Sequence, residues 1–174
     1  TTRMFVDPII EIDRERLTTY LESETKNRVT KIEAAGVCPK VLGSNDKFVE
    51  YLRSINIEPP TKRSPATGKN IPAFGKNDAG WKQMVAMYPE HNDIWQAREA
   101  VKSRLTETRA QRFLDAALDD NRIPAPLRYY AAHTGRFGGT EKLNMQNLPR
   151  GGELRKCLVA PKDHLVYVAD LSNI

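Results

Sequence analysis

The chain has 174 residues, of which 40% are hydrophobic and 28% are charged, a composition typical of a globular protein that buries a core. Its formal charge of +5 favours a polyanionic partner only weakly, because many basic proteins bind nothing acidic. Cys38 and Cys157 are isolated, which argues against a structural zinc site and indicates a reducing compartment such as the cytosol. No apolar run is long enough to cross a membrane, and no signal-peptide pattern is present.

Residues 1–12 form a short lead-in, and a helical period follows it. We expect a helix that begins at Asp13, a good N-terminal cap, and ends at Gly36. A second helix is predicted from Ser44 to Ile55. A third begins near residue 77 and is stopped by Pro89, with its Met and Trp residues on a buried face.

Residues 58–76 separate the second and third helices and are rich in Pro, Gly, Lys and Arg. They show no apolar period, so we expect an exposed basic loop, which includes Lys69. Two interpretations stay open for this loop. It is either a solvated linker or a segment that contacts phosphates.

The longest expected helix runs from Asn92 to about Leu118. Beside its apolar stripe lies a basic one, made of Arg98, Lys102, Arg109 and Arg112, whose spacing keeps these residues near one face. At the rise of an α-helix the cations span about 20 Å, enough to follow several phosphates of a duplex. Acidic residues in the same segment leave open that the cations only form ion pairs on a solvated surface.

Strands are expected in the last third of the chain, so the predicted fold class is α+β, with a helical part at 13–118 and a β-rich part at 121–174. Residues 157–160 and 165–169 predict two strands joined by a turn, the second of them buried on both faces. Asp170 follows this second strand. A rigid strand suits a carboxylate with a metal or catalytic role, but Asp170 is also a good cap for whatever follows.

Residues 133–150 combine three glycines in one stretch with a concentration of amide and guanidinium donors: Arg136, Asn144, Gln146 and Asn147. Such donors can bind the acceptors that every base pair presents in the minor groove of a duplex. The alternative is a glycine-rich turn whose amides hydrogen-bond to their own backbone.

These residues carry a resemblance to a known family. TGRFGG (134–139) followed by LNMQNLPR (143–150) resembles the TGR…NLQNIP motif of family A DNA polymerases, the DNA polymerase I type and especially its phage members. Residues 168–174 are similar to motif A of that family, a hydrophobic strand ending in DxSxxE, up to the residue before the glutamate. A short basic strand at 153–157 would connect the two motifs. The preceding helices resemble the family's thumb, including the loop at 67–69 and the segment 98–104.

The resemblance implies a role for each matching residue. Asp170 would bind two catalytic Mg²⁺ ions and the Leu171 carbonyl would bind one of them, for transfer of a nucleotide from a dNTP to the primer 3′-OH. Lys102 and Arg104 would contact the DNA backbone from the thumb. The primer–template duplex near its growing end would be held by Arg136, Asn144, Gln146 and Asn147. One departure is Phe137-Gly138-Gly139, where the family more often has Leu-Ser-Ser.

The expected protein is therefore a thumb followed by the first palm strands of a DNA-directed DNA polymerase. The fingers helix that binds the dNTP and the second catalytic carboxylate are not recognisable in the sequence, so we expect this chain alone to be inactive. The remaining palm and fingers would come from the same chain or from a separate one, because a truncated piece and half of a split enzyme fit equally. The rivals are a non-catalytic duplex-binding module and a basic structural domain with no role in nucleic-acid binding.

Overall fold

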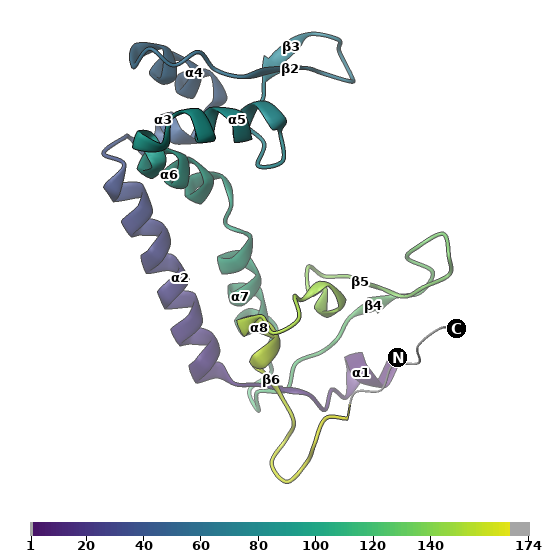
Figure 1. The fold of residues 1–174 in the computed structure, drawn as a ribbon. Coiled ribbons are helices and arrows are strands. Elements are labelled where there is room, and N and C mark those ends of the chain that lie inside the picture. The colour runs from purple at the N-terminus through teal and green to yellow at the C-terminus, as the bar shows by residue number, and fades with distance from the viewer. Residues whose placement is uncertain (1, 168–174) are drawn as a thin grey trace. The chain divides into compact units, whose positions relative to one another are not determined.

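The computed structural model describes residues 2–167, and its contacts divide the chain into two compact units. The first unit comprises residues 1–24 and 105–174, and the second comprises residues 25–104. The expected α+β class is confirmed, since the described elements are mostly helices with small two-stranded sheets (Figure 1). The predicted division into thumb and palm near residue 120 does not coincide with either unit boundary, and it stays a prediction.

The first unit contains short helices and two antiparallel strand pairs. β1 pairs with β6 with Ile12 opposite Leu158, and β4 pairs with β5 with Arg128 opposite Gly138. The elements are α1 (Thr2–Val6), β1 (Glu11–Ile12), the start of α2 (Arg14–Ala34), α7 (Leu105–Ala116), β4 (Leu127–Arg128), β5 (Gly138–Gly139), the 3₁₀ helix η2 (Met145–Asn147), α8 (Glu153–Lys156) and β6 (Leu158–Val159).

The core of the first unit joins helices to loops that are distant in sequence. Leu17 of α2 and Phe113 of α7 are at most 1% exposed. Leu143 and Leu148 of residues 133–150, which we call the glycine–amide segment, pack into the same cluster. Burying each such side chain contributes about 1.5–3 kcal/mol. The loop that carries the donor residues is thus anchored by its leucines to the helices.

Helix α2 begins where the sequence predicts. The carboxylate of Asp13 accepts a hydrogen bond from the Arg16 backbone N–H at 3.0 Å, which satisfies one of the free donors at the helix start. Arg14 ties this end of the helix to the segment after α7, because its Nε donates to the Asn121 side chain at 2.5 Å.

The second unit is built from helices packed around an aromatic core. Phe48 and Leu52 of α4 are fully buried, and the rings of Trp81 and Trp95 meet edge to face at 5.7 Å between centroids. Ser44 caps α4, as expected, by accepting from the Lys47 N–H at 3.4 Å. The elements are the end of α2, α3 (Pro39–Gly43), α4 (Asn45–Ser54), β2 (Thr61–Arg63), β3 (Asn70–Pro72), α5 (Ala79–Met87), the 3₁₀ helix η1 (Pro89–His91) and α6 (Asn92–Lys102).

The basic segment 58–76 is largely exposed as predicted, although Ala73 near its end is buried, and it is not an irregular loop. It forms the β2–β3 hairpin, with Lys62 opposite Ile71, and the Ser64 N–H donates to the Lys69 carbonyl at 2.8 Å at its end. Nearly every residue of β2 and β3 is exposed, so the hairpin has no apolar face. Hydrophobic periodicity therefore could not predict these strands.

The single helix expected from 92 to 118 is wrong. Helix α6 ends at Lys102, Ser103 is extended with φ −118° and ψ 104°, and α7 begins at Leu105. The break lets the two helices bury their apolar residues in different cores, with Ala97 in that of the second unit and Ala110 in that of the first. The proposed basic stripe is consequently not one face of one helix.

Two further expectations near the C-terminus need correction. Residues 153–156 form helix α8 rather than a basic strand, because this turn places Leu154 in the core. Residues 165–169 are predicted to form a strand buried on both faces, but in the described part of this run Leu165 and Tyr167 are 77% and 88% exposed and lie outside any strand. A strand is buried on both faces only when other layers cover it, and the described residues supply none there. Residues 168–174 lie outside the described part of the chain.

Arg98 lies in the middle of the second core and is 2% exposed. Its guanidinium donates to the Leu42 carbonyl and to the Asn45 side chain, and it lies 4.6 Å from the centre of the Phe48 ring. Burial lowers its pKa to about 10. Arg98 thus connects the α3–α4 turn to α6, and the predicted exposed cation at this position is wrong.

We expect Arg98→Ala to destabilise the second unit by about 2–4 kcal/mol, because it leaves buried acceptors without donors and opens a cavity beside Phe48. Both tryptophans of the chain lie in this unit, so urea unfolding followed by tryptophan fluorescence reports on it. Arg53→Ala is the control, since Arg53 forms only an exposed ion pair with Glu58 at 3.3 Å and its loss should cost less than about 1 kcal/mol. Equal losses in the two variants would contradict the structural role of Arg98.

Candidate nucleic-acid interface

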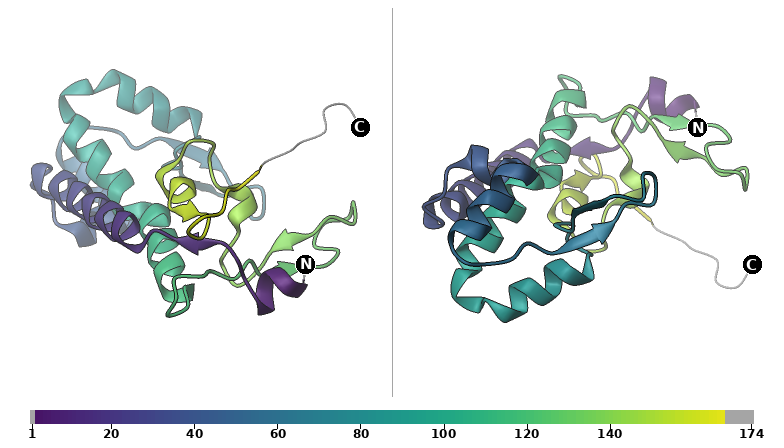
Figure 2. Two further views of the ribbon diagram at one scale, coloured as in Figure 1. Left: turned by 90° about the horizontal axis from the view of Figure 1, so that it is seen from below. Right: turned by 90° about the horizontal axis from the view of Figure 1, so that it is seen from above.

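The glycine–amide segment begins in the β4–β5 hairpin, which is drawn in green and extends away from the helices of the first unit (Figure 2). The hairpin is closed by the Ala131 N–H, which donates to the Arg136 carbonyl at 2.9 Å. Gly135 has φ +76°, a conformation that favours glycine, and the Tyr130 ring lies 3.3 Å from where a Cβ would be. This glycine lets the chain reverse and present Arg136 outward, where it is exposed.

The second half of the segment folds back against the hairpin. A Cβ on Gly139 would lie 2.6 Å from the Asn144 Cα, so only glycine permits this approach. Asn144 caps η2 by accepting from the Gln146 N–H at 3.1 Å. For Asn144 the side-chain oxygen therefore binds the backbone, as the alternative interpretation of this segment anticipated.

Three predicted donors remain exposed on this frame: Arg136, Gln146 and Asn147. Within residues 2–167, no hydrogen bond or ion pair engages their side chains. Buried Leu143 and Leu148 hold the backbone on which Gln146 and Asn147 stand. No described residue therefore occupies these donors, and their backbone is held in place for binding an external acceptor.

Helix α7 connects to the same segment through Arg112, whose Nε donates to the Glu141 carbonyl at 3.2 Å. Arg109 lies one turn earlier, and both arginines are half-buried. Arg109 and Arg112 therefore both lie on α7, the helix that contacts the glycine–amide segment.

The other predicted cations belong to the second unit. Lys69 is exposed on the β2–β3 hairpin, and Lys102 and Arg104 are exposed at and just after the end of α6. Partial burial, and then the charge of Arg98, lower the pKa of Lys102. The predicted DNA-contacting residues thus fall into two groups, one on each unit, and buried Arg98 belongs to neither.

The predicted metal ligands Asp170 and Leu171 lie outside the described residues. Among residues 2–167, no group of three or more His, Cys, Asp or Glu side chains is placed to hold a metal ion. The assignment of Asp170 and Leu171 as metal ligands rests on the sequence resemblance alone.

Sequence reasoning overlooked Arg128, Tyr129 and Tyr130 on the β4 side of the hairpin, which are all exposed. The available signal was the arginine directly before two aromatic residues, but strand propensity explained the aromatics equally well. Only the tertiary structure shows that they lie on a surface beside Arg136.

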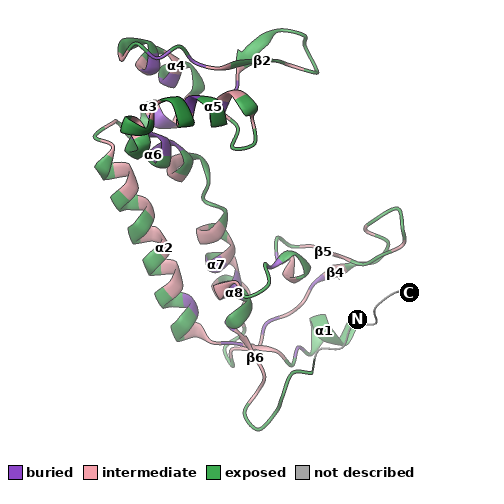
Figure 3. Ribbon diagram, in the orientation of Figure 1, coloured by how far each residue is buried: buried purple, intermediate pink, exposed green. Residues whose placement is uncertain are grey.

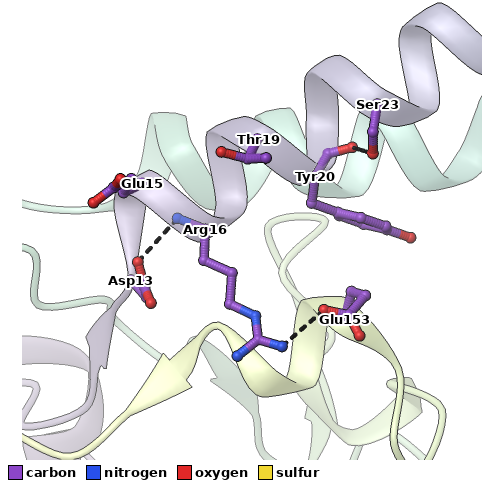
Figure 4. Close-up of a pocket in the computed structure, with 7 residues that line it drawn as sticks. All are labelled: Asp13, Glu15, Arg16, Thr19, Tyr20, Ser23 and Glu153. Atoms are coloured by element: carbon purple, nitrogen blue, oxygen red, sulfur yellow. Dashed lines mark hydrogen bonds and ion pairs between the residues drawn. The ribbon is translucent and has the colours of Figure 1, made fainter.

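A cavity of about 490 Å³ lies elsewhere on the first unit, between the start of α2 and α8 (Figure 4). Arg16 pairs with Glu153 at 2.9 Å, while Asp13 and Glu15 add further carboxylates to its lining. The cavity has more acidic than basic groups, which makes it a poor site for phosphates.

No helix in the described part of the chain has the length and apolarity needed to cross a membrane.

The fold resembles part of a polymerase domain. A solved structure with this fold is the POL domain of Pol1 from M. smegmatis, in complex with DNA primer-template and dNTP, with a TM-score of 0.61 and 22% sequence identity. The match covers 90% of this chain and 27% of that one, so the chain spans about a quarter of that structure's length. No protein-family model and no curated protein matches the sequence.

Glu153 provides a pH-dependent prediction. Hydrogen bonds from Lys156 and then Arg16 hold the pKa of its carboxyl below the usual range, so the folded state favours the ionised form. The resulting stability is present above the ordinary glutamate pKa and is lost as the pH falls through the lowered one. The melting temperature of wild type should therefore exceed that of Glu153→Gln at neutral pH, and the gap should narrow between about pH 5 and pH 3. Circular dichroism melts measure this.

Glu15→Gln is the matched control because Glu15 lines the same cavity but forms no ion pair among the described residues. Its melting temperature should follow that of wild type across the acid range. A constant gap between wild type and Glu153→Gln at all pH values would contradict the ion-pair explanation.

Proposed function

We propose that this chain is the thumb and the first part of the palm of a phage-type family A DNA polymerase, and that it holds primer–template duplex DNA. The thumb would comprise residues 13–118 and the palm residues 121–174. The observation that carries the proposal is the fold match along 90% of the chain to a POL domain in complex with DNA primer-template and dNTP. The ordered TGR and LNMQNLPR motifs support it independently.

The exposed side chains of the first unit support binding to duplex DNA of any sequence. Arg136, Gln146 and Asn147 are exposed donors on a fixed backbone, and the minor-groove acceptors N3 of purines and O2 of pyrimidines suit such donors at any base pair. Arg109 and Arg112 supply nearby positive charge. In the second unit Lys69, Lys102 and Arg104 would contact phosphates.

Catalysis belongs to the complete enzyme in this proposal. Asp170 and the Leu171 carbonyl would hold Mg²⁺, and the metal would supply electrostatic stabilisation for nucleotide transfer to the primer 3′-OH. One carboxylate does not satisfy two magnesium ions, and within residues 2–167 no group of three or more His, Cys, Asp or Glu side chains is placed to hold a metal ion. The contribution of this chain is therefore to position the duplex and to provide one ligand, while the remaining palm and fingers bind the dNTP.

Arg136→Ala should weaken duplex binding by about 5- to 100-fold, because a guanidinium contact to base edges is lost. The loss should be similar for duplexes of different sequence, since the minor-groove acceptors are shared. Fluorescence anisotropy with short labelled primer–templates at low salt measures the affinity.

Arg3→Ala serves as the control, since Arg3 is an exposed arginine on α1 that pairs with Asp7 at 3.6 Å. Its loss removes one positive charge without touching the donor loop. If both variants bind as wild type does, the donor loop has no role in gripping DNA. If wild type itself does not bind duplex at low salt, the whole proposal fails.

Asp170→Ala tests the catalytic part. The chain alone should not extend a primer, but mixing it with a chain that supplies the fingers and the second carboxylate should give Mg²⁺-dependent extension on a primer–template. Asp170→Ala should abolish extension while leaving duplex affinity within about twofold, because the carboxylate binds metal rather than the DNA backbone. Retained extension would exclude Asp170 as a metal ligand and would favour a non-catalytic duplex-binding module.

A further inference from the structure

The β4–β5 hairpin carries three exposed aromatic side chains, Tyr129, Tyr130 and Phe137, which we call the aromatic patch. Tyr129 and Tyr130 are 72% and 61% exposed, although aromatic residues normally bury most of their area, and Phe137 is 40% exposed. The hairpin is green, the colour of exposed residues, along most of its outer part in Figure 3. The proposed grip on the duplex does not use these rings.

The patch is a continuous group rather than three scattered residues. The Tyr129 ring lies 5.4 Å from that of Phe137 and 6.1 Å from that of Tyr130, measured between centroids. The β4–β5 pairing sets Arg128 opposite Gly138, which brings Tyr129 and Phe137 to facing positions on the two strands. Gly135 permits the close approach of Tyr130 to the turn. The hairpin thus holds the rings together in a fixed frame.

The charged residues of the hairpin itself are all basic. Residues 127–139 include Arg128, Arg136 and His133 but no aspartate or glutamate. Neither arginine side chain forms an ion pair or hydrogen bond within the described residues. Exposed aromatic rings flanked by unpaired arginines match the chemistry of a single nucleic-acid strand, in which bases stack on the rings and phosphates contact the cations.

We propose that the aromatic patch binds unpaired bases of a DNA strand next to the duplex, with Arg128 and Arg136 on its phosphates. Duplex DNA offers the rings less stacking than a single strand does, because its bases are already stacked on one another and present only their edges. This site rests on the proposed function, since it extends the duplex grip at Arg136 to the adjoining single strand. It makes the hairpin selective for a duplex that ends in an overhang.

The test compares a blunt duplex, the same duplex with a thymidine overhang, and the overhang strand alone, by fluorescence anisotropy with the 174-residue chain. Wild type should bind the overhang duplex more tightly than the blunt one. The double variant Tyr129→Leu/Tyr130→Leu should lose about fivefold or more in affinity for the overhang duplex and the single strand, because stacking on the rings is lost. Its affinity for the blunt duplex should change by less than about twofold.

Tyr167→Leu is the matched control, because Tyr167 is 88% exposed but has no described ring partner. Circular dichroism should show that the double variant keeps the wild-type melting temperature. A second measurement does not depend on folding of a variant: overhangs that contain 5-iodouracil should crosslink on irradiation to Tyr129 or Tyr130, located by mass spectrometry.

The outcomes separate this site from the proposed duplex grip. If wild type binds the blunt and overhang duplexes with equal affinity, or if the crosslinks fall on other residues, the aromatic patch does not bind unpaired bases. It is then a surface that contacts protein. If wild type binds the single strand but not the blunt duplex, the duplex grip fails while the aromatic site stands. If it binds none of the probes at low salt, both fail.

Discussion

The packing of Leu143 and Leu148 into the core of the first unit is the constraint on which the candidate interface depends. These two leucines flank η2 and hold it against α2 and α7, so that Gln146 and Asn147 can project from a fixed backbone. Polar side chains on a free loop would lose conformational entropy on binding, which would weaken the contact. The Arg112 side chain adds a hydrogen bond to the Glu141 carbonyl and couples the loop to α7. The two buried leucines thereby fix the backbone that carries the exposed polar side chains.

The second unit uses the opposite device, a buried cation that organises a hydrophobic core. Arg98 binds the carbonyl of Leu42 and contacts Phe48, which joins three helices through one side chain. Among the described residues the guanidinium contacts carbonyl, amide and aromatic groups and no carboxylate, so these groups stabilise its charge in place of a counterion. Lys69 and Lys102, by contrast, are exposed on the same unit. The basic side chain of Arg98 therefore has a structural role.

Several features could be predicted from local chemistry alone. Asp13 and Ser44 are the caps of α2 and α4 because a side-chain oxygen satisfies a free backbone donor wherever the helix starts. The motif at 134–150 resembles one of family A DNA polymerases, and the fold resembles part of a polymerase domain. Other features failed for a clear reason. The break at Ser103 follows from burial of α6 and α7 in two separate cores, and no local pattern encodes which core a helix joins.

The sequence by itself determined the α+β class and the exposed basic stretch around Lys69, whereas the DNA-binding role of the donors at 136–147 stays a prediction. These depend on neighbours a few residues apart, so local spacing was sufficient. The tertiary structure alone decided that Arg98 is buried and that Tyr129 and Phe137 share an exposed patch beside Arg136. Burial and shared surfaces arise from contacts between distant segments, and the same arginine or tyrosine has no local signal that distinguishes a core position from a surface one.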